Sequence, residues 1–182
     1  MATFASFLRE PTRPAAPRGF RLPLAGLATS AVLAWAAMLP AVAQAADPLV
    51  RFEGGIGVQP VRAGGAVNDV NLVPPGGRPW VISRLTAEVA TDGRIRVDGR
   101  GLLLAGGALI GTPGGQSVHA RLFCNNVAVG NSSPAVPLQP NGDFRIDGTL
   151  GNPMPSPCLT PVLLIVNDAA VRAWFAAGIP KD

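Results

Sequence analysis

Apolar and polar residues alternate along most of the chain after residue 45, and turn-forming residues interrupt this alternation about every ten positions. Alternation at a spacing of two places successive side chains on opposite faces of a strand, which is typical of a half-buried sheet. The pattern therefore predicts a single all-β domain over residues 46–182. We expect an antiparallel β-sandwich, Ig-like or jelly-roll-like, of about eight short strands.

Several stretches indicate where the strands lie. LVRFE (residues 49–53) is expected to form a first short strand, and Gly54, Gly55 and Gly57 are expected to loosen the chain after it. VLLIV (residues 162–166) is a continuous apolar run, which predicts a central strand that is buried on both faces. Other runs place apolar residues on one strand face: Leu85, Ala87 and Val89; Ile95 and Val97; Val118, Ala120, Leu122 and Cys124; Phe144 and Ile146.

Two segments are less regular. GGALIGTPGGQ (residues 106–116) lacks a G-x-G-x-x-G spacing and precedes a β pattern, so a loop is favoured over a nucleotide-binding cradle. Near the end of the chain, Asn167 and Asp168 are suited to capping a short helix through Arg172. We favour the alternative, a last strand in AWFAAGI (residues 173–179).

One motif occurs twice, as TDGRIRVDGRG (residues 91–101) and PNGDFRIDGTL (residues 140–150), 49 positions apart. Asp-Gly between alternating runs is a hairpin signal, because glycine adopts the positive φ that hairpin turns require. We therefore predict two hairpins of like construction. A calcium site is the alternative, but calcium loops group their ligands within about a dozen residues. A less favoured alternative, a carboxylate-dependent hydrolase, uses two of the same four acids: Asp92, Asp98, Asp143 and Asp147.

The first 45 residues have the organisation of an export signal. Four arginines, offset by Glu10, precede the apolar run LPLAGLATSAVLAWAAML (residues 22–39), and Ala43 and Ala45 supply a signal-peptidase site. We predict a signal peptide over residues 1–45 and a secreted or periplasmic mature protein. The alternative is a membrane anchor, since about 18 apolar residues just span a bilayer. The small residues directly behind the run favour cleavage, which leaves no stable membrane span.

The leader also accounts for most of the net charge. It holds four of the 15 Lys and Arg residues and one of the 11 acids, so 11 basic and 10 acidic residues remain. Nucleic-acid binding normally requires clustered positive charge or aromatic stacking platforms. The sequence shows neither, and we expect no nucleic-acid partner.

Cys124 and Cys158 are the two cysteines of the chain. Oxidation is favoured in an exported protein and each thiol has only the other as a partner, so a disulfide is predicted. The alternative is a reactive or metal-binding thiol pair. No C-x-x-C spacing supports it, and the one histidine, His119, does not complete a zinc site without carboxylates. We therefore expect no metal and no other cofactor.

The mature chain has few residues of the types that perform catalysis, with one His, one Lys and no Tyr. His119 is a conceivable base for Ser117, Ser132 or Ser133. No acid is evidently placed to orient its ring, however, and we expect it to face solvent from a strand. The sequence therefore predicts no catalytic residues and a protein that is not an enzyme.

Binding is less constrained than catalysis. Trp80 and Trp174 are the large aromatic residues of the mature chain and are its candidate ligand contacts. An exposed Trp stacks on the flat face of a sugar, so a carbohydrate-binding module with a glycan ligand is the main alternative function. In a core this poor in aromatics, each Trp is more often a packing residue.

VDGRGLLLAGG followed by IGT, and PVLLI followed by WFAAGIPK, resemble a group of small exported bacterial proteins with no assigned activity. The resemblance covers most of the chain from about Phe52 onward and implies no site. The chain departs from pilus subunits, which typically carry a Tyr near the C-terminus. We expect a non-catalytic β-sandwich of structural or binding role, stabilised by one disulfide, that meets an envelope or extracellular partner.

Overall fold

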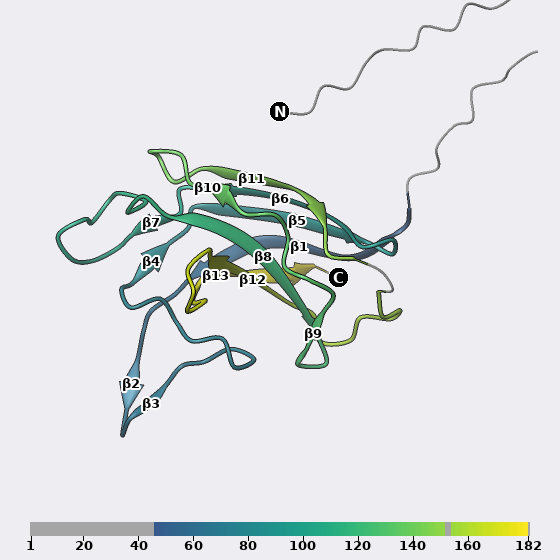
Figure 1. The fold of residues 1–182 in the computed structure, drawn as a ribbon, viewed down its shortest axis with the longest axis horizontal. Coiled ribbons are helices and arrows are strands. Elements are labelled where there is room, and N and C mark those ends of the chain that lie inside the picture. The colour runs from purple at the N-terminus through teal and green to yellow at the C-terminus, as the bar shows by residue number, and fades with distance from the viewer. Residues whose placement is uncertain (1–45, 152–153, 182) are drawn as a thin grey trace, which may run out of the picture. The chain divides into compact units, whose positions relative to one another are not determined.

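The computed structural model describes residues 46–151 and 154–181, all of which belong to one compact unit, Ala43–Asp182 (Figure 1). These residues form strands, turns and loops and contain no helix. The prediction of an all-β domain is confirmed. The predicted signal peptide lies outside the described residues. Within the described part of the chain, no helix is long and apolar enough to cross a membrane.

The described residues form thirteen strands, of which seven have six residues or more, close to the eight expected. The last strand, Trp174–Lys181, confirms the extended alternative for the end of the chain. The strands are β1 (Pro48–Gly57), β2 (Arg62–Ala63), β3 (Ala66–Val67), β4 (Trp80–Val81), β5 (Arg84–Ala90), β6 (Arg94–Arg100), β7 (Leu103–Leu104), β8 (Ser117–Cys124), β9 (Val127–Val129), β10 (Val136–Pro137), β11 (Phe144–Thr149), β12 (Val162–Asn167) and β13 (Trp174–Lys181).

A nine-stranded antiparallel sheet makes up most of the domain, in the order β10-β8-β12-β13-β1-β5-β6-β11, with β9 paired to β8. The sheet curls so that its two edge strands, β10 and β11, contact each other, which gives a half-barrel rather than two separate sheets (Figure 1). Two short pairs, β2 with β3 and β4 with β7, lie outside this sheet.

The core fills the inside of the curl. The alternating residues predicted to face inward are buried, and the continuous run in β12 is fully buried from Leu163 to Val166. Burial on both faces explains why this strand does not alternate. The first strand extends further than predicted, because the glycines after Glu53 stay in β1 beyond an irregularity between Phe52 and Gly55.

The duplicated motif forms a strand pair. The first copy makes the expected β5–β6 hairpin around Gly93. The predicted second hairpin is wrong, because β10 pairs with β8 while β11 pairs with β6. Pro137 in β10 has no amide hydrogen to donate, so β10 stays short. The free edge of β6 instead offers β11 a six-residue ladder.

In that ladder the two copies of the motif complement each other. Arg145 lies opposite Asp98, and Asp147 lies opposite Arg96, at 3.6 Å between charged atoms. Opposite charges across neighbouring strands stabilise an antiparallel pair, whereas like charges destabilise it. The repeated Arg-x-Asp order therefore lets one copy pair with the other in antiparallel register.

Cys124, at the end of β8, and Cys158, in the segment before β12, form the predicted disulfide across a sequence separation of 34 residues. The bond closes the part of the chain that contains β9, β10 and β11, and it joins the end of β8 to the segment before the neighbouring strand β12. No free cysteine remains in the described part of the chain.

Candidate functional site

A cavity of about 340 Å³ lies at the end of the half-barrel that carries β4 and β7. Its walls come from the segment before β4, the glycine-rich loop between β7 and β8, the end of β12 and the start of β13. The mouths of β-barrels are common positions for small-molecule sites, and the volume falls within their usual range. The lining residues are Gly76, Gly77, Arg78, Trp80, Leu104, Leu109, Gly114, Gln116, Asn167, Ala173 and Phe175.

Two stacked aromatic rings form the apolar part of this cavity. The rings of Trp80 and Phe175 have centroids 4.1 Å apart and planes inclined by 16°. Backbone hydrogen bonds hold both residues, because Trp80 N–H donates to the Val58 carbonyl and Val58 N–H donates to the Phe175 carbonyl. Gly76 lies against the pair, and a Cβ there would come within 2.9 Å of the Phe175 ring. The aromatic wall therefore depends on segments from three parts of the chain.

The polar side chains of the cavity include several hydrogen-bond donors. Asn167 Oδ1 accepts the Ala173 N–H at 2.8 Å, which leaves the side-chain NH₂ without a partner among the described residues. Gln116 Nε2 makes only a long bond of 3.3 Å to the Gly114 carbonyl. Arg78 is exposed and forms no ion pair with another described residue. None of the described lining residues carries a carboxylate.

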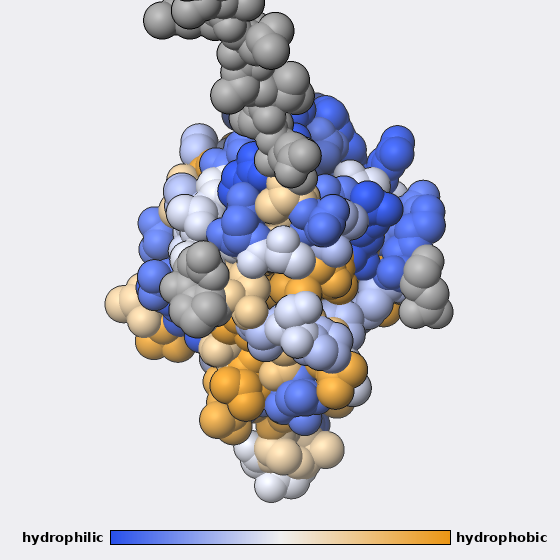
Figure 2. All heavy atoms as spheres, turned by 90° about the vertical axis from the view of Figure 1, so that its right-hand side faces the viewer, coloured by the Kyte–Doolittle hydropathy of each residue, from blue (hydrophilic) through white to orange (hydrophobic). Residues whose placement is uncertain are grey.

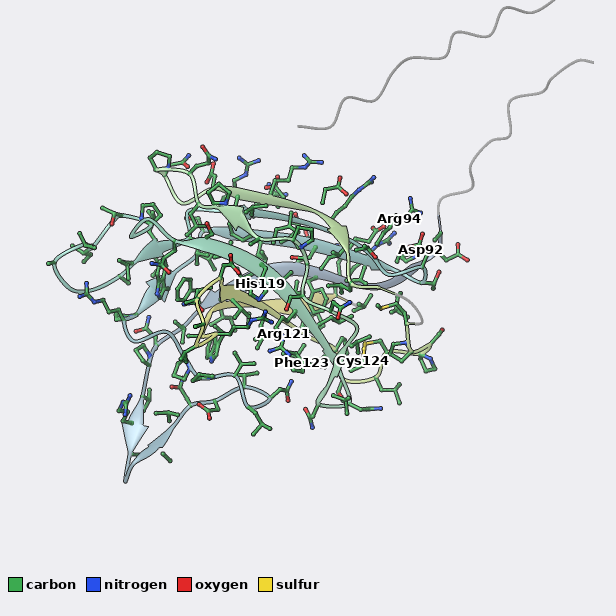
Figure 3. All side chains as sticks on the ribbon, in the orientation of Figure 1. Asp92, Arg94, His119, Arg121, Phe123 and Cys124 are labelled. Carbon is green, nitrogen blue, oxygen red and sulfur yellow. A yellow bond between two sulfur atoms is a disulfide. The ribbon has the colours of Figure 1, made fainter. Side chains whose placement is uncertain are left out.

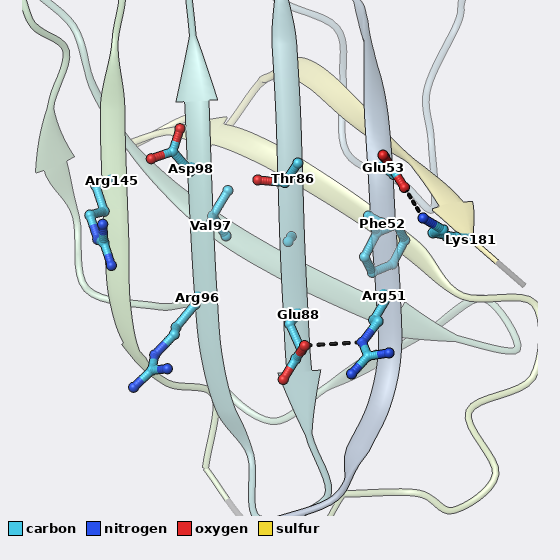
Figure 4. Close-up of a pocket in the computed structure, with 11 residues that line it drawn as sticks. Arg51, Phe52, Glu53, Thr86, Glu88, Arg96, Val97, Asp98, Arg145 and Lys181 are labelled. Atoms are coloured by element: carbon cyan, nitrogen blue, oxygen red, sulfur yellow. Dashed lines mark hydrogen bonds and ion pairs between the residues drawn. The ribbon is translucent and has the colours of Figure 1, made fainter. Parts of the chain in front are cut away.

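A second hollow, of about 420 Å³, lies open on the outer face of β1, β5, β6 and β11 (Figure 4). Its side chains carry both charges. Arg51 pairs with Glu88 at 3.0 Å, and Lys181 pairs with Glu53, whose pKa its hydrogen bond lowers. Exposed pairs of this kind contribute little energy individually. Paired charges on an open sheet surface are typical of a face that is exposed to solvent. Hydrophilic side chains dominate the upper half of the view in Figure 2.

The four acids of the duplicated motif are each held by an arginine. Arg100 binds both Asp98 and Asp143, at 2.8 and 3.0 Å. The Gly101 N–H and then Arg100 lower the pKa of Asp143. The Arg94 backbone N–H and side chain likewise lower the pKa of Asp92 (Figure 3). Both carboxyls stay ionised at neutral pH, and a general acid requires the opposite shift.

Within the described ranges, no group of three His, Cys, Asp or Glu is placed to hold a metal ion.

His119 does not face solvent, and that prediction is wrong. It is 2% exposed on β8, on a face where Phe123 is also buried (Figure 3). On this face of β8 His119 and Phe123 are buried, whereas Ser117 and Arg121 are partly exposed. Burial, and then the charge of Arg172, lower the pKa of His119, and its Nδ1 lies 4.0 Å from the exposed Asp168 carboxylate.

The serines near His119 have other partners. Ser133 Oγ accepts the Ala120 N–H at 2.8 Å and donates to the Pro134 carbonyl at 3.0 Å. Ser132 Oγ accepts a hydrogen bond from Arg172 at 3.0 Å. His119 Nε2 has no partner among the described residues. This geometry does not place a serine hydroxyl against the imidazole, which a nucleophilic Ser–His pair requires.

The two candidate tryptophans have different positions. Trp80 is 3% exposed and lines the cavity, whereas Trp174 is 7% exposed and is absent from its lining. Trp174 contributes through its backbone, which exchanges hydrogen bonds with Pro74 and Gly76 beside the aromatic wall. Sequence reasoning did not find Phe175, Arg78 and Asn167 as lining residues. The available signal was the pair of glycine-rich stretches that flank the cavity, at residues 76–77 and 106–115.

Comparison with known proteins adds no assignment, because no protein family, curated protein or solved structure matches this chain.

Proposed function

We propose that the protein is an exported, non-catalytic binding domain whose ligand site is the cavity beside Trp80 and Phe175. The observation that carries the proposal is the cavity's construction. A mostly apolar hollow with a few converging polar groups is the usual form of a small-molecule site. The disulfide fits an oxidising compartment, where such bonds persist, and supports a secreted or periplasmic location.

The alternatives from the sequence have less support. A sugar that stacks on Trp needs an open ring face and polar partners for its hydroxyl groups, whereas Phe175 covers one face of Trp80 and Trp174 is absent from the cavity lining. Two-carboxylate hydrolysis needs one acid with a raised pKa beside a second carboxylate. The acids of the duplicated motif pair with arginines instead.

The proposal is tested with a thermal-shift screen of the disulfide-bonded mature chain against small acids, amines, neutral apolar compounds and oligosaccharides. Ala173→Leu places a larger side chain in the cavity and retains the backbone N–H that Asn167 binds. We expect apolar compounds to raise the melting temperature of the wild type, because ligands that bind only the folded state stabilise it. We expect that shift to be lost in A173L.

Ala63→Leu, on the exposed strand β2, is the matched control and should behave as the wild type. The melting temperature of each variant without ligand shows whether it folds. A wild type that responds to no compound class, or an A173L variant that binds as well as the wild type, would contradict the proposed site. A response to oligosaccharides alone would favour the carbohydrate alternative.

A further inference from the structure

We infer that the ligand of this cavity is a small apolar monocarboxylic acid, with its carboxylate at Arg78 and its apolar body against Trp80 and Phe175. The inference rests on the proposed function and deepens it by naming the ligand class.

Among the described residues, Arg78 is the one charged residue in the lining. Six ion pairs join charged side chains elsewhere in the described ranges, a seventh contact joins His119 to Asp168, and none of them includes Arg78. A guanidinium that lacks an internal acid is available to an external one, and its planar fork matches a carboxylate. One cation without a second favours a ligand with a single negative charge.

The guanidinium lies close to the glycine-rich loop. Gly107, in the loop between β7 and β8, lies beside it, and a Cβ at that position would come within 3.0 Å of Arg78 Nη1. Gly107 has a φ of 85°, a conformation that favours glycine. The loop therefore approaches the Arg78 head group closely, at the edge of the cavity that both segments border.

The two amides add donors. The Ala173 N–H fixes the oxygen of the Asn167 amide, and the NH₂ group of that amide has no partner among the described residues. Gln116 contributes a second, weakly engaged NH₂ group. A carboxylate has two acceptor oxygens and no donor when ionised, so it complements this set. A protonated amine would carry the same charge as Arg78 and would be repelled by it.

The rest of the lining selects the body of the ligand. Leu104, Leu109 and the stacked rings make this part of the lining apolar. The hydroxyl groups of a sugar-like ligand would find no hydrogen-bond partners there. An aromatic or branched aliphatic acid meets both requirements.

The test is isothermal titration of the mature, disulfide-bonded protein at pH 7 with three probes: 3-phenylpropanoate, 3-phenylpropanamide and 3-phenylpropylamine. We expect the acid to bind at least about tenfold more tightly than the amide, as a charge-assisted hydrogen bond implies, and the amine to bind most weakly. Arg78→Gln should remove the preference for the acid, so that the variant binds the acid and the amide about equally. Arg62→Gln, at an exposed position on β2, is the matched control and should retain the preference.

Equal binding of acid and amide, or a preference that survives in R78Q, overturns the assignment of an acidic ligand. If A173L then abolishes the binding of both compounds, the proposed site still stands. Absence of binding by all three probes also overturns the assignment, and the thermal-shift screen decides separately whether the cavity binds any small molecule.

Discussion

Replacing both cysteines, in the variant Cys124→Ala with Cys158→Ala, should lower the free energy of unfolding by about 3–4 kcal/mol. The disulfide spans 34 residues, and closing a loop of that length restricts the unfolded chain and so raises its free energy. Because the bond joins the end of β8 to the segment that enters β12, we expect no other contact to replace it. Urea unfolding followed by far-ultraviolet circular dichroism measures the change.

Reduction of the wild-type protein is the matched control, because it breaks the bond without changing the side chains that pack around it. The reduced wild type and the double variant should lose stability to within about 1 kcal/mol of each other, since Cys124 is buried and its replacement leaves a small void. A loss below about 1 kcal/mol in both would show that the disulfide does not hold the domain together as described.

Gly99→Ala should destabilise the domain by about 2–3 kcal/mol, the cost of forcing an extra carbon into a packed core. Gly99 lies opposite Phe144 where the two copies of the duplicated motif pair, and the Phe144 ring covers it. A Cβ at Gly99 would overlap the outer atoms of that ring. Thermal and urea unfolding of the single variant measure the loss. Gly77→Ala is the matched control, because no atom lies within 4 Å of a Cβ there.

A double-variant cycle separates this contact from a general intolerance of the strand. Phe144→Leu removes the ring atoms that lie nearest to Gly99, so Gly99→Ala should cost less than about 1 kcal/mol in that background. An equal cost in both backgrounds would show that Phe144 is not the obstacle, and the described packing of the motif would be wrong.

The sequence predicted the local features of the fold well. The β5–β6 hairpin was predictable because the alternation and the Asp-Gly turn are both encoded within some fifteen consecutive residues. The second copy carries the same local signals, yet β11 pairs with β6. Local sequence specifies a turn and a strand face, but the choice of partner strand depends on edges that only the whole sheet provides.

The site was predicted less completely, for a related reason. Trp80 was a candidate because a Trp is conspicuous in any sequence, whereas Phe175 and Asn167 become neighbours of it only when β12 and β13 reach β4. The burial of His119 had a similar cause. The alternation in β8 places His119 on the face opposite Leu122 and so predicts that it is exposed. In the structure β8 lies between β10 and β12, and His119 and Phe123 are buried on that face.

The measurement that tests the account most directly is the intact mass of the protein after export into a bacterial periplasm, with and without reduction and thiol alkylation. We expect a chain that begins at Ala46, with both thiols blocked until reduction. That result joins the predicted leader, the exported location and the Cys124–Cys158 bond in one observation. An uncleaved chain whose two thiols alkylate freely would contradict the account of an exported, disulfide-stabilised binding domain.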